Sequence, residues 1–148
     1  MLQIGYFSSA IGPQEATVVH KILVEARKAN RRDMITGLLI AGGGRYLQII
    51  EGPPSAVTAL YDKIRLDGRH MAVATFLKRE INERSFGSWS MAFRRPTLAW
   101  GPDIFNHVLK ALTGEIVDPM LKAQVRYFVG AMITDHGLDL KAQGRRAA

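Results

Sequence analysis

The chain has 148 residues, 47% of them hydrophobic, and its 20 Lys and Arg against 13 Asp and Glu give a formal net charge of +7. This length suits one domain with a proper core, and no apolar run of roughly 18 residues is present to cross a bilayer. The lack of cysteine excludes disulfides and thiolate chemistry, fits a cytoplasmic protein, and goes with an N-terminus that has no signal-peptide pattern.

The first predicted elements are a strand over 1–8 and a helix over 14–30. Asn30 stands where this helix is expected to stop, a position that suits a C-cap. Residues 34–52 then read as two apolar strands joined by a turn at the three glycines 42–44, which predicts a hairpin.

After the hairpin, Ser55 is expected to cap a helix over about 56–67. A fourth strand follows over 71–80, then a polar loop over 81–88, then a fifth strand on which Trp89, Met91 and Phe93 alternate. The order β-α-β-β-α-β-β predicts an α+β, ferredoxin-like sheet with both helices on one face.

The remaining residues, 103–136, carry apolar residues at helical spacing and predict two helices, the second starting at Pro119. We expect them to cover the opposite sheet face or to form a dimer contact. From Gly137 onward the chain is polar, and we expect a mobile tail.

Gln48 is a polar residue inside an apolar strand, between Leu47 and Ile49. If both sheet faces are covered it is a buried amide, which must find hydrogen-bond partners. By strand parity Tyr6 shares its face, so a phenol–amide pair is expected. Such a pair can be purely structural, since each group satisfies the other.

More polar residues gather at the edges of this face, and apolar Ile22 and Ile64 lie between the two helices. The polar set is Ser8, Asn30, Lys63, Arg65, Asp67, Arg69 and His70. Amides at one edge and cations at the mouth of an apolar gap suit a planar, phosphorylated ligand.

Other function classes find less support. The four histidines do not pair at metal-ligand spacing, so we expect no metal. No nucleophile or acid–base pair stands out, so we expect no enzyme. The basic charge leaves an alternative, a ferredoxin-like nucleic-acid or protein-binding module without cofactor. An RNA-binding aromatic pattern is missing, so we do not expect nucleic acid as a partner.

Five motifs, in order and at familiar spacing, resemble the BLUF family of blue-light sensors using FAD. They are Tyr6–Ser8, Asn30 with Ile35–Leu39, Tyr46–Pro53, Asp67–His70 and Phe86–Met91. The resemblance implies a flavin-binding domain over 1–95 and, over 96–148, a helical extension like that of short, single-domain members.

The resemblance also implies FAD held non-covalently between the two helices. By position, Tyr6 matches the photoactive tyrosine, Gln48 the switching glutamine and Asn30 the asparagine at the flavin edge. The matched residues around the tyrosine–glutamine pair are Ser8, Trp89 and Met91; the expected tail contacts are Lys63, Asp67, Arg69 and His70. Ala29 stands where many members have His or Asn.

In this family light causes a small, reversible red shift of flavin absorption, so the expected role is a switch that signals to a partner protein. Trp89 and Met91 are the expected link to the output. The sequence does not identify the partner; the apolar stripes over 103–136 predict a signalling surface and a homo-oligomer contact.

Overall fold

A computed structural model describes residues 1–87, 89–94, 116 and 118–130. The chain divides into two compact units, Met1–Arg94 and Arg95–Ala148. The first unit holds, in chain order, β1 (Leu2–Ala10), α1 (Ala16–Arg32), β2 (Thr36–Gly42), β3 (Arg45–Gly52), α2 (Pro54–Arg65), β4 (His70–Glu80) and β5 (Ala92–Arg94). The predicted α+β, ferredoxin-like order of elements is confirmed.

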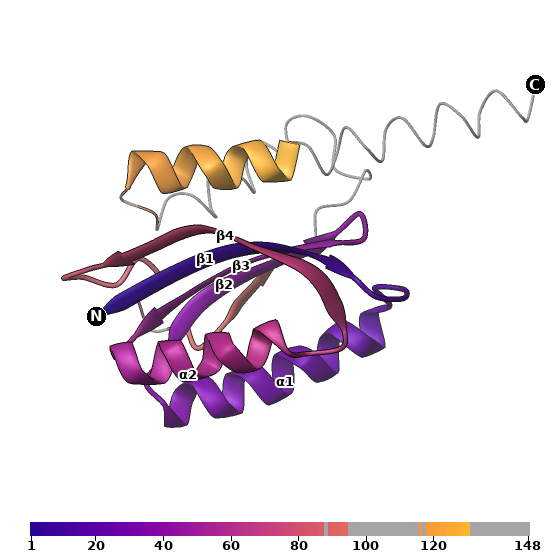
Figure 1. Ribbon diagram of the computed structural model, residues 1–148, viewed down its shortest axis with the longest axis horizontal. Helices are drawn as coiled ribbons and strands as arrows, with labels where there is room; N and C mark the ends of the chain where they lie inside the picture. Colours follow the sequence, from indigo (N-terminus) through magenta and orange to yellow (C-terminus); the bar gives the residue numbers. More distant parts are fainter. Residues whose placement is uncertain (88, 95–115, 117, 131–148) are drawn as a thin grey trace, which may run out of the picture. The chain divides into compact units, whose positions relative to one another are not determined.

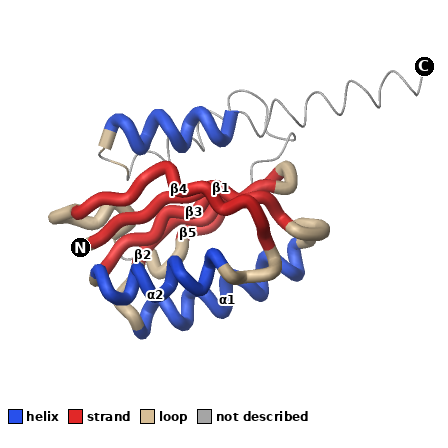
Figure 2. The backbone as a smooth tube through the Cα atoms, viewed as in Figure 1, coloured by secondary structure: helices blue, strands red, loops and turns tan. Residues whose placement is uncertain are grey.

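The five strands form one sheet in the order β4-β1-β3-β2-β5, with α1 and α2 side by side on one of its faces (Figures 1 and 2). The pairs β4–β1, β1–β3 and β3–β2 are antiparallel, whereas β5 joins β2 in parallel. The β2–β3 hairpin turns on Gly43 and Gly44, whose φ angles of 58° and 73° favour glycine.

The core lies between the two helices and the sheet. Alternate strand residues point into it, as a period of two requires, and meet one apolar stripe from each helix. Its buried members are Ile4, Val19, Leu23, Ile35, Leu39, Ala41, Tyr46, Ile50, Val57 and Met91. The residues of β1 and β3 that face the helices are therefore those that strand parity predicts.

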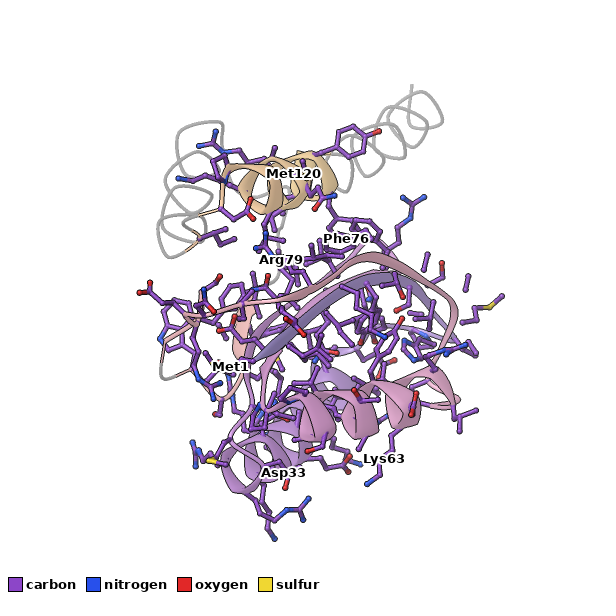
Figure 3. All side chains as sticks on the ribbon, turned by 60° about the vertical axis from the view of Figure 1, so that its left-hand side comes forward. Met1, Asp33, Lys63, Phe76, Arg79 and Met120 are labelled. Atoms are coloured by element: carbon purple, nitrogen blue, oxygen red, sulfur yellow. The ribbon has the colours of Figure 1, made fainter. Side chains whose placement is uncertain are left out.

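The opposite sheet face carries side chains of the other parity. Phe76 and Arg79 of β4 extend away from the helices (Figure 3). The ring of Phe76 stacks on Phe7 of β1 with centroids 4.4 Å apart. Leu47 and Ile49 of β3 are fully buried on this side.

Three local predictions are wrong. Asn30 is not the C-cap, because α1 continues to Arg32 and Asp33 takes that position. Ser55 does not cap α2, which begins one residue earlier at Pro54, where proline's fixed φ suits a first turn. The fifth strand starts only at Ala92, after Trp89 and Met91.

The second unit is described over residue 116 and residues 118–130. A helix spans 119–130, and the Asp118 carboxylate accepts the backbone N–H groups of Met120 and Leu121 at 2.7 and 3.1 Å, an N-cap arrangement. The expected helix over 104–112 and the expected tail lie outside the described residues. Coverage of the sheet by 103–136 stays a prediction.

Candidate functional site

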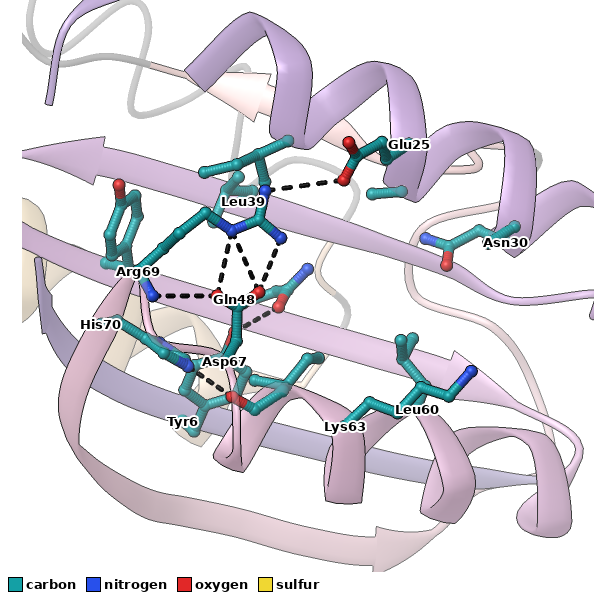
Figure 4. A pocket seen from close by; sticks show the side chains of 15 residues that line it. Tyr6, Glu25, Asn30, Leu39, Gln48, Leu60, Lys63, Asp67, Arg69 and His70 are labelled. Atoms are coloured by element: carbon teal, nitrogen blue, oxygen red, sulfur yellow. Dashed lines mark hydrogen bonds and ion pairs between the residues drawn. The ribbon is translucent and has the colours of Figure 1, made fainter. Parts of the chain in front are cut away.

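A cavity of about 300 Å³ lies between α1, α2 and the sheet. The first helix contributes Ile22, Glu25, Ala26, Ala29 and Asn30; the strands contribute Tyr6, Leu39, Tyr46 and Gln48; α2 and the residues after it contribute Leu60, Lys63, Ile64, Asp67, Arg69 and His70. Figure 4 shows these side chains converging from the three sides. All nine residues expected to bind the cofactor line this one cavity.

Tyr6 and Gln48 form the floor of the cavity. They are direct cross-strand partners on β1 and β3, 3% and 7% exposed, and the Tyr6 hydroxyl donates a hydrogen bond to Gln48 Oε1. The other end of the amide, Nε2, donates to the Met91 thioether sulfur at 3.6 Å. The amide therefore joins a strand tyrosine to the segment before β5, with its two ends facing different partners.

Burial raises the pKa of Tyr6 far above its usual value of 10.0, and the nearby Tyr61 and Asp67 add to this shift. The ring of Tyr61 lies 5.7 Å from that of Tyr6, centroid to centroid. Tyr6 is therefore a neutral phenol at any physiological pH. Its proton is held by the hydrogen bond to Gln48.

On the α1 side of the cavity, helix side chains hydrogen-bond to backbone carbonyls of the segment before β5. Asn30 is 1% exposed, and its Nδ2 donates to the Ser90 carbonyl at 2.6 Å. One turn earlier, Arg27 Nε donates to the Met91 carbonyl at 3.0 Å. Met91 is thus hydrogen-bonded through both its backbone carbonyl and its sulfur. Trp89 is half-buried and does not line the cavity.

Charged side chains surround the mouth. Arg69 donates to both carboxylate oxygens of Asp67, at 2.6 Å for Nη2 and Oδ2, and its Nη1 lies 3.5 Å from Glu25 Oε2 (Figure 4). The Arg69 hydrogen bonds are the main cause that lowers the pKa of Asp67. Lys63 is exposed on α2, and Figure 3 shows it extending outward from that helix.

Ser8 lies behind the wall of the cavity. Its hydroxyl oxygen is 2.8 Å from His70 Nδ1, while His70 Nε2 hydrogen-bonds to the Ile64 carbonyl. This fixes the imidazole between β1 and the C-terminal part of α2. Ser8 thus contacts the site through His70.

Sequence reasoning missed Glu25 and Arg27. Helical spacing could have found Glu25, which is three residues after Ile22 and four before Ala29, both on the cavity face of α1. Arg27 could not be found this way, because its partner is a backbone carbonyl 64 residues further along.

The described residues contain no cluster of three His, Asp or Glu side chains that could hold a metal ion. None of the helices drawn in colour in Figure 1 is long and apolar enough to cross a membrane.

The fold and this site define a class of protein: a ferredoxin-like domain whose two helices and sheet enclose a cavity above a buried phenol–amide pair. Comparison with known proteins identifies the family to which this chain belongs. The model described as sensors of blue-light using FAD, BLUF, matches residues 1–92. The chain belongs to the BLUF family of blue-light sensors, and its cofactor is FAD.

Similar proteins include light-regulated cyclases. The chain is 33% identical over 113 residues to photoactivated adenylate cyclase subunit beta of Euglena gracilis, covering 73% of this chain and 13% of that protein. The dark-state structure of BlrB, a BLUF protein, matches with a TM-score of 0.63 at 30% identity. The match covers 76% of this chain and 86% of the BlrB chain. A bacterial light-regulated adenylyl cyclase has a TM-score of 0.65 at 29% identity, over 90% and 40% of the two chains.

The chain spans only 9% to 14% of the length of the curated relatives it matches. The cyclase activity named for those relatives is therefore a property of much longer proteins.

The cavity has the chemistry that FAD needs. Its volume lies at the lower end of ligand pockets, roughly 300–1,000 Å³, and its inner walls include Ile22 and Ile64 from opposite helices. Amides at Asn30 and Gln48 can meet the polar edge of a flavin ring. The cations Lys63 and Arg69 at the mouth can meet phosphates.

Proposed function

We propose that Tyr6 and Gln48 are the light switch of this sensor and that Met91 reads its state. The observation that carries the proposal is the continuous hydrogen-bonded path from the Tyr6 hydroxyl through the Gln48 amide to the Met91 sulfur. A structural pair would need only the first of these bonds. The second leads out of the cavity to the segment before β5.

When bound and excited by blue light, FAD supplies a strong one-electron oxidant. Tyr6 would give one electron to this oxidant, and its hydroxyl proton would pass along the existing hydrogen bond to Gln48 Oε1. Burial leaves the hydroxyl with Gln48 Oε1 as its hydrogen-bond acceptor, which gives the proton a defined route. Return of the electron and the proton restores the phenol, so nothing is consumed.

Gln48 changes its hydrogen bonds during this cycle by rotation or by tautomerisation. Either change alters what its two ends offer: a rotated amide turns Oε1 toward Met91 and Nε2 toward Tyr6. The contact between Nε2 and the Met91 sulfur is then lost. The segment before β5 is the nearest element that can carry the change outward.

The remaining site roles follow from position around the cavity. Ile22 and Ile64 would enclose the ring, and Asn30 would present its amide at the ring edge. Lys63, Asp67, Arg69 and His70 would hold the ribityl and phosphate chain, with Ser8 orienting His70. Trp89 would move with Met91, to which it is joined through Ser90.

We further propose that residues 1–95 are the sensor and that 96–148 form a helical extension through which the protein meets its partner and its own copies. In this proposal the chain has no catalytic activity and signals to a separate protein. The shares of the cyclase relatives that the chain covers support a role as the sensing part. Cytoplasmic location stays a prediction.

The test is an absorption spectrum of the purified protein, in the dark and after blue light. We expect bound flavin whose bands shift slightly to the red and recover in the dark. Tyr6→Phe and Gln48→Leu should keep flavin and lose the reversible shift. Tyr61→Phe removes a second phenol, whose ring lies beside that of Tyr6, and should retain the shift. A full photocycle in either of the first two variants would refute the assignment of the switch.

A further inference from the structure

Glu51 is a fully buried carboxylate near the end of β3. It lies three residues after Gln48, so strand alternation places it on the opposite sheet face. Its Oε1 accepts from the Thr36 hydroxyl at 3.0 Å and the Phe86 N–H at 2.8 Å. Its Oε2 accepts from Gln3 Nε2 and the Ser85 N–H, both at 3.0 Å.

These four donors come from three parts of the fold. Gln3 and Thr36 are the cross-strand partners of Glu51 on β1 and β2, so they would lie beside it in any sheet of this register. Ser85 and Phe86 belong to the loop between β4 and β5, and they donate through their backbones. A carboxylate that accepts at both oxygens forms strong, charge-assisted bonds, so it anchors this loop firmly.

Arg84 strengthens the same anchor. Its Nη1 donates to the Thr36 hydroxyl at 2.8 Å and to the Glu51 carbonyl at 3.2 Å, and its Nη2 donates to the Met34 carbonyl at 2.7 Å. Residues 84–86 are therefore fixed to the sheet by both side-chain and backbone bonds, and the Phe86 side chain is 1% exposed.

From this anchor, backbone bonds lead to the light switch on the other face. The Trp89 N–H donates to the Phe86 carbonyl, and the Trp89 carbonyl accepts from Gly37 N–H on β2, both at 3.0 Å. The next two residues are those held by Asn30, Arg27 and Gln48 at the cavity. The loop thus joins a buried carboxylate on one sheet face to the Gln48 amide on the other.

We propose that Glu51 is a positioning residue of the light switch, the fixed point against which residues 89–91 move when Gln48 changes its hydrogen bonds. This inference rests on the proposed function of Tyr6 and Gln48. With residues 85 and 86 held, loss of the Gln48–Met91 contact displaces only the short stretch that follows. Without the hydrogen bonds of the Glu51 carboxylate, the loop is already mobile in the dark. Light then produces no further change in its order.

Glu51→Gln tests this with almost no change in shape. One amide NH₂ then faces two groups that are themselves donors, on whichever side it is placed. One of the two is a strand residue and the other is a backbone N–H of the loop, so either placement loses one bond to the loop and one bond to the sheet. The probes are the amide protons of Gly37 and Trp89, which do not touch Glu51. Their hydrogen exchange is measured by NMR in the dark and under blue light.

In the parent protein we expect slow exchange at both amides in the dark and faster exchange in the light. In Glu51→Gln we expect dark exchange at least about tenfold faster, as loss of a charge-assisted bond implies, and a light-minus-dark difference that disappears. The Tyr6–Gln48 pair is intact, so the red shift of flavin absorption should persist. A spectral switch without a loop response is a signature that general destabilisation does not produce.

Glu83→Gln, an exposed carboxylate of the same loop, is the matched control and should behave like the parent. The amide of Ile50 in β3 should exchange slowly in every variant, which excludes global unfolding. If Glu51→Gln fails to fold, Thr36→Val removes one donor and one Arg84 acceptor and should give a smaller change of the same kind.

Parent-like exchange at Gly37 and Trp89, dark and light, in a folded Glu51→Gln or Thr36→Val protein would overturn the inference. Absence of any red shift in the parent would instead refute the proposed function. The two failures are therefore distinguished by the absorption spectrum of the unmodified protein.

Discussion

The hydrogen bond between Tyr6 and Gln48 can be measured without light, by a double-mutant cycle on flavin-free protein. The perturbations are Tyr6→Phe, Gln48→Leu and their combination. Both side chains are more than nine-tenths buried, so each single change leaves a buried polar group that has lost its partner. The combination replaces both groups with apolar ones of similar shape.

Each single variant leaves one buried group without its partner. Tyr6→Phe leaves Gln48 Oε1 without its donor, and Gln48→Leu leaves the Tyr6 hydroxyl without its acceptor. Each should cost about 1–3 kcal/mol. In the double variant no polar group is stranded, so the total loss should fall short of the sum by about 1–2 kcal/mol.

The assay is urea unfolding followed by circular dichroism, with free energies extrapolated linearly to water. Tyr6→Phe paired with Tyr46→Phe gives the control cycle, because Tyr46 lines the same cavity but lies on the next helix-facing position of β3. Losses for Tyr6→Phe and Gln48→Leu that add to within about 0.5 kcal/mol would show that the two groups are not bonded in the folded protein.

Three further predictions concern pH, the cavity mouth and the sheet. Burial raises the pKa of Tyr6 above its usual 10.0, so the contribution of Tyr6 to stability is complete below pH 10.0 and is lost as the pH rises further. The loss of stability at alkaline pH should therefore be smaller in Tyr6→Phe. Equal pH dependence of melting in the two proteins would contradict this. Glu25→Gln removes a competitor for Arg69 and should tighten binding of flavin mononucleotide by up to about fivefold, with riboflavin, which lacks phosphate, as the unaffected control in a fluorescence titration. Gly37→Ala would place a Cβ 2.2 Å from a β3 carbonyl and should lower the unfolding free energy by about 3 kcal/mol or more, whereas Gly68→Ala, with open space around it, should melt like the parent.

Residue spacing was enough to predict the order of elements and the sheet face that Tyr6 and Gln48 share. Strand periodicity is a local property, so the parity of Tyr6 and Gln48 followed from counting residues, and apolar spacing located both helices. The glycine turn needed only the conformational freedom of Gly43 and Gly44. These conclusions hold because backbone geometry dictates which side chains share a face.

Helix ends were harder to predict. Asn30 is a suitable C-cap by residue type, but packing of α1 against the sheet extends the helix to Arg32 and buries the Asn30 amide against Ser90. A C-capping preference is worth about 0.3–1.5 kcal/mol, which tertiary contacts readily exceed. Likewise the strand expected at Trp89 begins only at Ala92, because α1 side chains hold the preceding backbone.

Contacts between residues far apart in the chain could be found only from the three-dimensional fold. Met91 as the second partner of Gln48, Arg27 on the Met91 carbonyl and the four donors around Glu51 join residues between 15 and 64 positions apart. Periodicity can place a residue on a face, but it does not carry the sheet order or the path of the loop from one face to the other. Those depend on how the strands pair, and the register of β1, β2 and β3 brings the Glu51 and Gln48 networks into one domain.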